Sequence, residues 1–347
     1  MTKACFAIPG DLNTPTGGYI YDRTVMGLLP ACGVEVEHLA LPDGFPFPSA
    51  ADLAETARLL GSVEADVVVI DGLALGVLPP AVLAAVKAPI VAMHHHPLGL
   101  ETGLSPESRE ALLASEKAAT AFARHVIVTS QTTADTLAEL GFAPPPLVTI
   151  AIPGTPPGAR SMGSGGGFEI IAVGTVVRRK GYDILIAALA RLRGEPWNCT
   201  IVGGLDRDIP CVEALRALVA ESGLEERIRF AGVLGADEIN ALYHRADVFA
   251  MPSRYEGYGM AFAGAMSHGL PILATTAPAI PSTVPPEAGI LVAPDDAEAF
   301  ADALLRLMRD ADLRRRLGDG GWAHAQTLPR WEDTAVIIAN VIKEVGA

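Results

Sequence analysis

Residues 252–260 carry the residue types best suited to chemistry in this chain. Glu256 follows a short apolar run at residues 247–251, and Gly257 and Gly259 leave the backbone bare before a helix of small residues begins. The first N–H groups of a helix have no partner within it, and they bind phosphate well. A carboxylate beside them indicates chemistry on a phosphorylated ligand. A plain strand-to-helix turn is the alternative that Glu-Gly-x-Gly alone leaves open.

A basic cluster lies where a phosphate would need it. Arg178, Arg179 and Lys180 follow the apolar run at residues 169–173 and precede a helical pattern at residues 184–192. The net charge of the chain is −14, so an anionic ligand must be held by local basic residues. Guanidinium and ammonium groups both bind phosphate oxygens. We therefore expect these cations to hold a diphosphate rather than to form a solvated turn.

Two features of the N-terminal half could also face a ligand. Gly17 and Gly18 permit close approach by a phosphate or a sugar, although their loop lacks the G-x-G-x-x-G pattern of dinucleotide-binding proteins. His94, His95 and His96 end the apolar run at residues 90–93. Three adjacent imidazoles cannot all point one way, which argues against a zinc site. One of them is well placed to hydrogen-bond a substrate hydroxyl or to carry a proton.

Two other groups of residues are predicted to be structural. Asp206 and Asp208 match an Asp-x-Asp metal signature, but they lie in a loop before a helix and are expected to cap that helix or to form a solvated loop. The four cysteines are scattered without a C-x-x-C pair, and Cys5, Cys32 and Cys199 lie in or beside apolar segments. We expect those three to be small core residues of a reduced protein.

Composition excludes several classes of function. The chain of 347 residues is 50% hydrophobic and 19% charged, and its acidic balance argues against nucleic acid and anionic membranes as partners. The N-terminus lacks the apolar core of a signal peptide. The most apolar region, residues 73–93, is interrupted by Pro79, Pro80 and Lys87. We therefore expect a cytoplasmic protein with no integral membrane segment.

The elements that must position these residues alternate along the chain. Apolar runs at residues 4–8, 34–41, 67–70, 90–93, 125–129 and 147–152 alternate with helical patterns, and six more occupy residues 169–173, 199–202, 228–231, 248–251, 272–275 and 290–292. Strands that are apolar throughout and alternate with helices predict parallel sheets covered on both faces. The charged alternation of residues 34–41 predicts a sheet edge.

A polar stretch rich in Pro, Gly and Ser divides the alternation in two. We assign residues 1–158 and 168–330 to two α/β domains joined by a flexible linker at residues 159–167. A last amphipathic helix at residues 331–347 could pack on either domain. Ligands of such sheets bind at the carboxyl ends of the strands, which predicts a cleft where two such edges face each other.

Several segments together resemble the GT4 type of retaining glycosyltransferase. The matching segments are residues 174–183, 228–234, 242–253, 255–260 and 289–294, joined in the first domain by residues 126–135 and 153–155. The resemblance covers nearly the whole chain and is looser in the first domain. It implies the GT-B fold, in which two facing Rossmann-like domains with parallel sheets enclose an interdomain cleft.

The resemblance also implies roles for single residues. Arg179 and Lys180 match the basic pair that holds the donor's diphosphate, with Arg178 beside them, and Glu256 matches a carboxylate near the transferred sugar. His95, or else His96, matches a histidine that contacts the donor sugar. The segment that contacts sugar and phosphate through its backbone is matched by Gly257, Tyr258, Gly259 and Met260. The rim around the nucleobase is matched by Val233 and Leu234. The resemblance further implies that no metal or other cofactor is needed, since enzymes of this family usually need no catalytic metal.

The sequence departs from the family pattern at two positions. A second glutamate, described as gripping the donor's ribose, is expected eight residues after Glu256, where this chain has Gly264. Thr175 stands where many relatives carry a phosphate-binding arginine, for which Arg178 is a candidate replacement. The first departure puts full activity in question.

The resulting hypothesis is a metal-independent enzyme that moves a hexose from a UDP- or GDP-sugar to an unknown acceptor with retention of configuration. The alternative, motivated by Gly264, is a weakened or non-catalytic relative that binds a nucleotide, a sugar or a partner protein. A sugar-nucleotide epimerase is disfavoured because the sequence offers no convincing pair of carboxylates for acid–base work.

Overall fold

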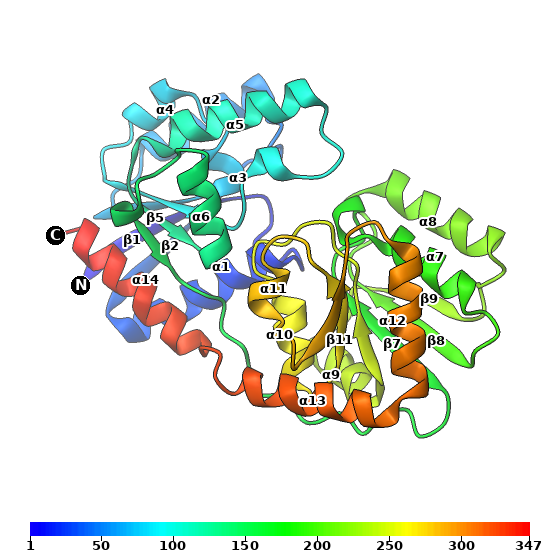
Figure 1. The fold of residues 1–347 in the computed structure, drawn as a ribbon. Helices are drawn as coiled ribbons and strands as arrows, with labels where there is room; N and C mark the ends of the chain where they lie inside the picture. Colours follow the sequence, from blue (N-terminus) through cyan, green and yellow to red (C-terminus); the bar gives the residue numbers. More distant parts are fainter. The chain divides into compact units, whose positions relative to one another are not determined.

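The computed structural model describes all residues from Met1 to Ala347 and divides into two compact units. Unit 1 comprises Met1–Gly154 and Pro329–Ala347, and unit 2 comprises Thr155–Leu328. Each unit contains a six-stranded sheet, and every strand pair in both sheets is parallel. Helices flank both sheets (Figure 1). The predicted α/β class with two Rossmann-like domains is confirmed.

The sheet of unit 1 has the strand order β2-β1-β3-β4-β5-β6. Its strands are β1 (Thr2–Pro9), β2 (Val34–Leu41), β3 (Val67–Asp71), β4 (Ile90–His94), β5 (Ala123–Val128) and β6 (Val148–Ile150). Its α-helices are α1 (Gly17–Leu28), α2 (Ala50–Gly61), α3 (Gly72–Leu75), α4 (Pro80–Ala84), α5 (Pro106–Thr120), α6 (Gln131–Glu139) and α14 (Trp331–Val345), and its 3₁₀ turns are η1 (Leu29–Cys32), η2 (Leu98–Leu100) and η3 (Pro145–Leu147). β2 lies at the edge of the sheet, as its charged alternation predicted.

Side chains of β1 divide the core of unit 1 between the two faces of the sheet. Ala4, Phe6 and Ile8 belong to one buried cluster, and Ala7 belongs to the other. This division follows from the two-residue period of a strand, which sends successive side chains to opposite faces. A strand buried on both faces must be apolar throughout, which explains why its pattern was readable in the sequence.

Helix α14 completes one of these two clusters. Ile338 and Ile342 are fully buried in the cluster that contains Phe6, and Lys343 Nζ donates a hydrogen bond to Cys32 O at 2.6 Å. The C-terminal helix therefore packs on the N-terminal domain, one of the two placements that the sequence left open.

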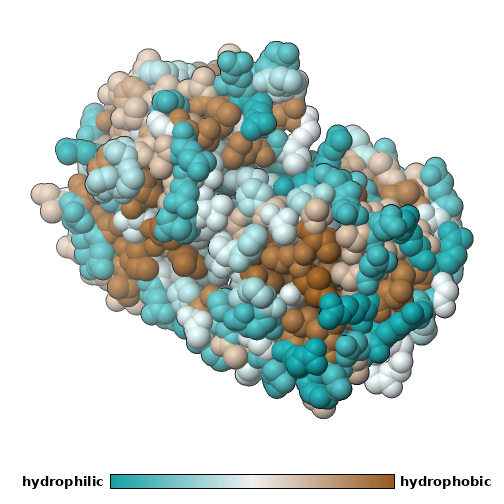
Figure 2. All heavy atoms as spheres, in the orientation of Figure 1, coloured by the Kyte–Doolittle hydropathy of each residue, from teal (hydrophilic) through white to brown (hydrophobic).

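The sheet of unit 2 has the strand order β12-β11-β10-β7-β8-β9. Its strands are β7 (Phe168–Val173), β8 (Trp197–Val202), β9 (Ile228–Gly232), β10 (Val248–Ala250), β11 (Ile272–Thr275) and β12 (Gly289–Val292). Its helices are η4 (Arg178–Lys180), α7 (Tyr182–Arg191), α8 (Ile209–Glu221), α9 (Ala236–Arg245), α10 (Met260–Ser267), α11 (Ile280–Thr283), α12 (Ala297–Arg309) and α13 (Ala311–Ala325). The outer helices are amphipathic: α12 buries Phe300, Leu304 and Leu307, and hydrophilic residues lie over the outer helices of this unit in Figure 2.

The boundary between the units lies earlier than the sequence predicted. Ser161 N donates to His268 O at 2.7 Å, Ser161 Oγ donates to Ala246 O at 2.7 Å, and Met162 N donates to His244 O at 2.9 Å. The segment expected to be a flexible linker is thus bonded to unit 2, and the chain passes between units at Gly154–Thr155 and Leu328–Pro329. A composition rich in glycine and serine does not reveal such backbone bonds.

The strand orders create one topological switch point in each unit. In unit 1 the chain leaves β1 for β2 on one side and then places β3 on the other side of β1. In unit 2 the chain runs from β7 through β8 to β9 and then places β10 on the opposite side of β7. Loops that follow the two strands at a switch point diverge, and ligands of open α/β sheets bind between them. No helix of the chain has the length and apolar character required to cross a bilayer.

Candidate functional site

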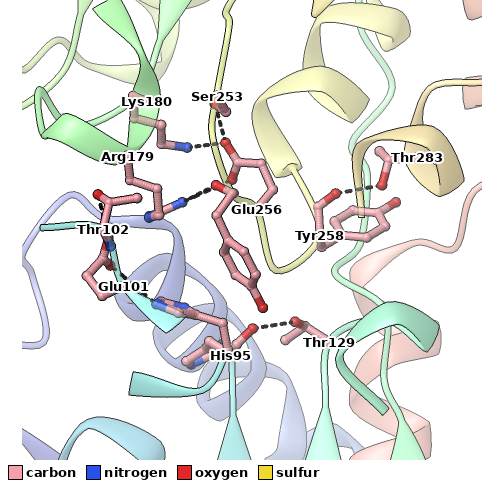
Figure 3. A network of polar contacts seen from close by, with 12 residues as sticks. His95, Glu101, Thr102, Thr129, Arg179, Lys180, Ser253, Glu256, Tyr258 and Thr283 are labelled. Carbon is pink, nitrogen blue, oxygen red and sulfur yellow. Dashed lines mark hydrogen bonds and ion pairs between the residues drawn. The ribbon is translucent and has the colours of Figure 1, made fainter. Parts of the chain in front are cut away.

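The switch point of unit 2 brings the predicted basic pair and carboxylate together. Arg179 and Lys180 lie in η4 after β7, and Glu256 follows β10. Lys180 Nζ lies 2.7 Å from Glu256 Oε1, Ser253 Oγ donates to the same oxygen at 2.7 Å, and Arg179 Nη1 lies 3.4 Å from Glu256 Oε2 (Figure 3). The side chain of Glu256 is only 6% exposed. Lys180 and Arg179 precede Glu256 by 76 and 77 positions in the chain, and the three side chains form one cluster of charges.

Glycine lets the two loops approach each other closely. Gly181 ends η4 with a left-handed φ of +70°, and a Cβ atom there would lie 2.0 Å from Pro252 O. Arg254 N donates to Arg179 O at 2.8 Å across the same approach. A side chain at position 181 would therefore push apart the loops that carry Lys180 and Glu256.

Arg254 ties the two loops together with its side chain as well. Its guanidinium donates to both carboxylate oxygens of Asp183, at 2.9 and 2.6 Å, to Asp295 Oδ1 at 2.6 Å, and to Arg178 O at 2.8 Å. A planar fork that donates to a carboxylate through two bonds holds its partner in one orientation. Sequence reasoning missed Arg254 because the partners that give it a role are distant in the chain.

The electrostatics keep Glu256 ionised. Burial alone would raise the pKa of its carboxyl, but Lys180 and then Arg179 outweigh burial and lower the pKa below its usual value. One carboxylate thus faces two cations, so the cluster carries a net positive charge. Such a cluster attracts an anionic ligand.

The helix terminus that the sequence predicted lies after a short loop that follows Glu256. Helix α10 begins at Met260, and its N-cap residue Gly259 has a left-handed φ of +96° and no side-chain cap. Tyr258 O accepts a hydrogen bond from Thr283 Oγ1 at 2.5 Å, which holds the loop before the helix. The loop also contains Gly257. Residues 257–260 therefore adjoin the charge cluster through Glu256.

The two departures from the family pattern lie close to this cluster in the chain. A Cβ atom on Gly264, in α10, would meet nothing nearer than Tyr243 Oη at 3.8 Å, which is ordinary van der Waals contact. Thr175 follows β7, in a loop fixed by the hydrogen bond from Val176 N to Gly204 O at 2.9 Å. Arg178 is exposed.

The predicted nucleobase rim lies at the same sheet edge of unit 2. Val233 and Leu234 follow β9, and the side chain of Val233 is 55% exposed. A Cβ atom on Gly204, after β8, would lie 4.0 Å from Val233 Cγ2, so the loops after these two strands are adjacent. The structure places an exposed apolar residue at this edge.

The switch point of unit 1 positions His95. This residue follows β4, and its Nε2 lies 3.2 Å from Asp22 Oδ1 of α1 and 3.4 Å from Asp71 Oδ2 at the end of β3. The exposed side-chain fractions are 19% for His95, 2% for Asp22 and 5% for Asp71. Thr129 Oγ1 donates to His95 O at 3.3 Å, which fixes the backbone here (Figure 3).

Sequence reasoning did not select either aspartate. Asp71 carries a usable signal, because it directly follows a buried strand at a carboxyl edge. Asp22 carries a weaker one: it is a charged residue on the buried face of α1, beside Tyr21 and Val25. A buried charge requires a partner, and that requirement points to the histidine.

Charge pairing changes the protonation of this group. Burial alone would lower the pKa of His95, but Asp22 and then Asp71 outweigh burial and raise the pKa to about 10. Burial also raises the pKa of Asp22 to about 6, with His95 opposing that shift. Both aspartates thus favour the protonated form of His95.

Gly18 has a packing role next to His95, in addition to the ligand contact predicted for it. A Cβ atom on Gly18 would lie 3.2 Å from His95 Cδ2, so the bare Cα accommodates the imidazole ring. Gly17, its neighbour, begins α1. Phosphate contact by Gly17 and Gly18 stays a prediction.

The three histidines point in different directions, as expected for adjacent residues. His94 is fully buried, its Nε2 lies 3.1 Å from Thr120 Oγ1, and burial lowers its pKa to about 4. His96 is half-buried, with Nε2 at 3.4 Å from Glu101 Oε2. His94 is therefore a neutral core residue, whereas His95 and His96 have access to solvent.

The structure also clarifies which residues could hold a metal. Ligand atoms of Asp22, Asp71 and His95 lie within 4.8 Å of one another. Since the imidazole nitrogen already lies at hydrogen-bond distance from Asp22, we interpret this group as a hydrogen-bonded ion triad.

Asp208 caps α8 by accepting a hydrogen bond from Cys211 N at 3.1 Å, which confirms its predicted role. All four cysteines are free, and Cys5 and Cys199 are buried as predicted, whereas Cys32 is half-buried.

Two family models match this chain. The model for glycosyl transferases group 1 matches residues 167–310, and the model for the glycosyl transferase 4-like domain matches residues 13–153. The first match contains the Glu256 cluster, and the second contains the His95 triad.

Curated proteins provide the second comparison. The GDP-mannose-dependent alpha-(1-6)-phosphatidylinositol monomannoside mannosyltransferase of Mycobacterium tuberculosis is 33% identical over 186 residues, 50% of this chain and 47% of that protein. The D-inositol 3-phosphate glycosyltransferase of Corynebacterium glutamicum is 32% identical over 180 residues, 50% of this chain and 43% of that protein. The chain spans about half the length of the curated relatives it matches.

Solved structures provide the third comparison. Sucrose-phosphate synthase from Thermosynechococcus elongatus superposes with a TM-score of 0.83 at 22% identity, over 98% of each chain. Anabaena HepE in complex with UDP and glucose superposes with a TM-score of 0.78 at 20% identity, over 99% of this chain and all of that one. At these identities the likeness shows the shared fold.

Proposed function

This chain belongs to the group 1 glycosyltransferases and has the GT-B fold, and on that premise we propose that it transfers a hexose from a nucleoside-diphosphate sugar to an acceptor with retention of configuration. The observation that carries the proposal is the buried contact of Glu256 with Lys180 and Arg179 beside the uncapped N-terminus of α10. In this proposal the two cations hold the donor's diphosphate and Glu256 lies near the transferred sugar.

The charges at this cluster suit departure of a nucleoside diphosphate. The leaving group gains negative charge as the glycosidic bond breaks, so cations and N–H dipoles fixed in place stabilise the transition state more than the ground state. Removing one such donor typically costs about 3–4 kcal/mol of barrier. We propose that Arg179, Lys180 and the α10 terminus supply this stabilisation in place of a divalent metal.

Two of the similar proteins suggest candidate nucleotides for the donor. The Mycobacterium tuberculosis relative is named for GDP-mannose, and Anabaena HepE is bound to UDP and glucose. We propose a GDP- or UDP-linked mannose or glucose as the donor. The exposed Val233 and the adjacent Leu234 would contact its base.

A donor panel tests the proposal. Purified protein is incubated with UDP-, GDP- and ADP-sugars, and release of the nucleoside diphosphate is measured by mass spectrometry with and without a mixture of sugar and polyol acceptors. We expect one donor to be turned over, slowly by hydrolysis and faster with an acceptor. A folded protein that turns over none of the donors would refute the proposal.

The same panel distinguishes the alternative, a relative that binds its ligand without turnover, which Gly264 motivates. Gly264→Glu introduces a carboxylate at a position where an added Cβ atom would meet only Tyr243 Oη, at 3.8 Å. We expect this variant to bind the donor more tightly and to raise kcat/KM in a weakened enzyme. Binding of a nucleotide in a thermal-shift assay, without turnover by either protein, would favour the alternative.

A further inference from the structure

The ion triad of unit 1 has a feature that the proposed function does not use. Nε2 of His95 lies between two carboxylates, Oδ1 of Asp22 at 3.2 Å and Oδ2 of Asp71 at 3.4 Å. An ionised carboxylate can only accept a hydrogen bond, so this nitrogen must carry a proton. The geometry thus sets the tautomer of the ring without reference to any ligand.

Each aspartate is itself held in place. Asp71 Oδ1 accepts a hydrogen bond from Leu73 N at 2.8 Å, as the N-cap of α3, which leaves Oδ2 directed at the histidine. Asp22 is on α1, is 2% exposed, and its Oδ2 is buried without a hydrogen-bond partner. A buried carboxylate with so few donors depends on the imidazolium for its stabilisation.

The other titratable groups beside His95 are Tyr21, His94 and His96. Tyr21 of α1 meets the imidazole edge-on, with ring centroids 5.3 Å apart, and burial keeps its phenol protonated by raising its pKa. His94 is neutral in the core, and His96 faces Glu101. The two aspartates are the charged groups in direct contact with His95 Nε2, at 3.2 and 3.4 Å, and they raise its pKa.

We propose that Asp22 and Asp71 are positioning residues that hold His95 as an oriented imidazolium throughout the neutral range, so that it meets the substrate as a cation and hydrogen-bond donor and not as a base. The inference rests on the proposed function for the identity of that substrate, a sugar. Two carboxylates and one imidazolium leave the triad with a net negative charge. Such a group favours a neutral hydroxyl over a phosphate, so the diphosphate belongs at the cations of unit 2.

Direct titration of His95 tests the proposal in the free protein, without any donor. The chain has eight histidines, so a sample with ¹³C-labelled histidine gives few resonances, and the signal lost in His95→Gln assigns His95. We expect the Cε1 shift of His95 to stay at its imidazolium value from pH 6 to 9. A midpoint near the ordinary value of about 6.5, or below it, would overturn the proposal.

Variants add a catalytic readout that a merely structural role would not change. Asp22→Asn should lower the pKa of His95 and create a new basic limb in the pH profile of kcat/KM. If the pKa falls to its ordinary value or to at most one unit above it, kcat/KM at pH 8.5 should fall about ten- to a hundredfold more than at pH 6. Asp71→Asn should act in the same direction. Asp135→Asn, an exposed aspartate of α6, is the matched control and should leave the profile unchanged.

Two further outcomes distinguish a positioning role of the aspartates from a metal site and from a purely structural role. Addition of equimolar Zn²⁺ should not move the His95 resonance. A shift that EDTA reverses would show that the triad is a metal site, and it would overturn the proposal. A flat pH profile of kcat/KM in Asp22→Asn would also overturn the proposal, provided that unchanged resonances of the other histidines show the fold to be intact. Failure of the donor panel alone would leave the titration result standing, so the two proposals fail independently.

Discussion

At the scale of single residues, Glu256 differs from an ordinary surface carboxylate in its surroundings. It is almost fully buried and contacts Lys180, Arg179 and Ser253. A buried charge is tolerated only when it is paired and hydrogen-bonded. The cluster is thus held together by its own charges, and a diphosphate would share the two cations with the carboxylate.

The first prediction concerns this carboxylate. Glu256→Gln keeps the shape of the side chain and the hydrogen bond from Ser253 but removes the charge. We expect kcat/KM with the active donor to fall on the order of a hundredfold, because the electrostatics near the transferred sugar are lost. We expect the free energy of unfolding to fall by at most about 3 kcal/mol, as measured by urea denaturation at pH 7.

The pH dependence of that stability difference has a definite sign. The folded pKa of Glu256 is lowered, so its ionised form contributes stability above the unfolded value of about 4.5, and this contribution is lost as pH falls through the folded value. The difference between wild type and Glu256→Gln should therefore shrink below pH 4.5. Glu298→Gln removes an exposed ion pair with Arg191 and serves as the matched control. Equal losses of activity in both variants would contradict a specific role for Glu256.

Single residues also show what the sequence could reveal. The sequence predicted Arg179, Lys180 and Glu256 as site residues because each follows an apolar run, and the carboxyl ends of parallel strands share one edge of the sheet. The sequence did not predict Asp22 as a site residue, because its role depends on a contact with His95, 73 positions away. Whether residues so far apart meet depends on the order of the strands in the sheet, and the periodicity of apolar residues does not reveal that order.

At the scale of elements, the sequence was most informative where burial is uniform. Each predicted run overlaps a strand, and most of these runs were visible because a strand covered on both faces must be apolar along its whole length. The short helices α3, α4 and α11 were not predicted, since four or five residues are too few to show a helical period. The linker was misplaced for another reason: Ser161 satisfies its hydrogen bonds on unit 2.

The second prediction concerns the connection between two elements. Arg254 bonds Asp183 of α7, Asp295 and the carbonyl of Arg178, and so holds η4 beside the loop of Glu256. Arg254→Lys keeps the charge but loses the planar fork. We expect the KM for the donor to rise about tenfold with a smaller change in kcat, since a hydrogen bond to a charged group contributes about 1.5–3 kcal/mol.

Its control separates positioning from general stability. Arg309→Lys alters an exposed ion pair with Glu195 on the same unit and should change neither KM nor Tm. Nucleoside diphosphate binding is measured by calorimetry alongside Tm for both variants. A lowered Tm in Arg254→Lys with unchanged nucleotide affinity would indicate that Arg254 supports the fold alone.

At the scale of the whole molecule, the chain crosses between its units twice. The second crossing, at Leu328–Pro329, delivers α14 to the sheet of unit 1. Two ends of the chain therefore share one hydrophobic core: Phe6 of β1 and Ile338 of α14 belong to the same cluster. Unit 1 cannot complete its core until the last residues of the chain are present.

The last prediction tests that dependence. Ile338 is fully buried, so Ile338→Ala should destabilise unit 1 by about 2–5 kcal/mol. Val336→Ala, on the same helix at a position 49% exposed, should change stability by less than about 0.5 kcal/mol. Hydrogen exchange followed by mass spectrometry reports each unit separately through peptides from β1 and β7. We expect β1 to lose protection in Ile338→Ala while β7 keeps it, because α14 contributes its buried residues to the core of unit 1. Equal loss in both strands would mean that the two units unfold as one, and the stability of unit 2 would then also depend on α14.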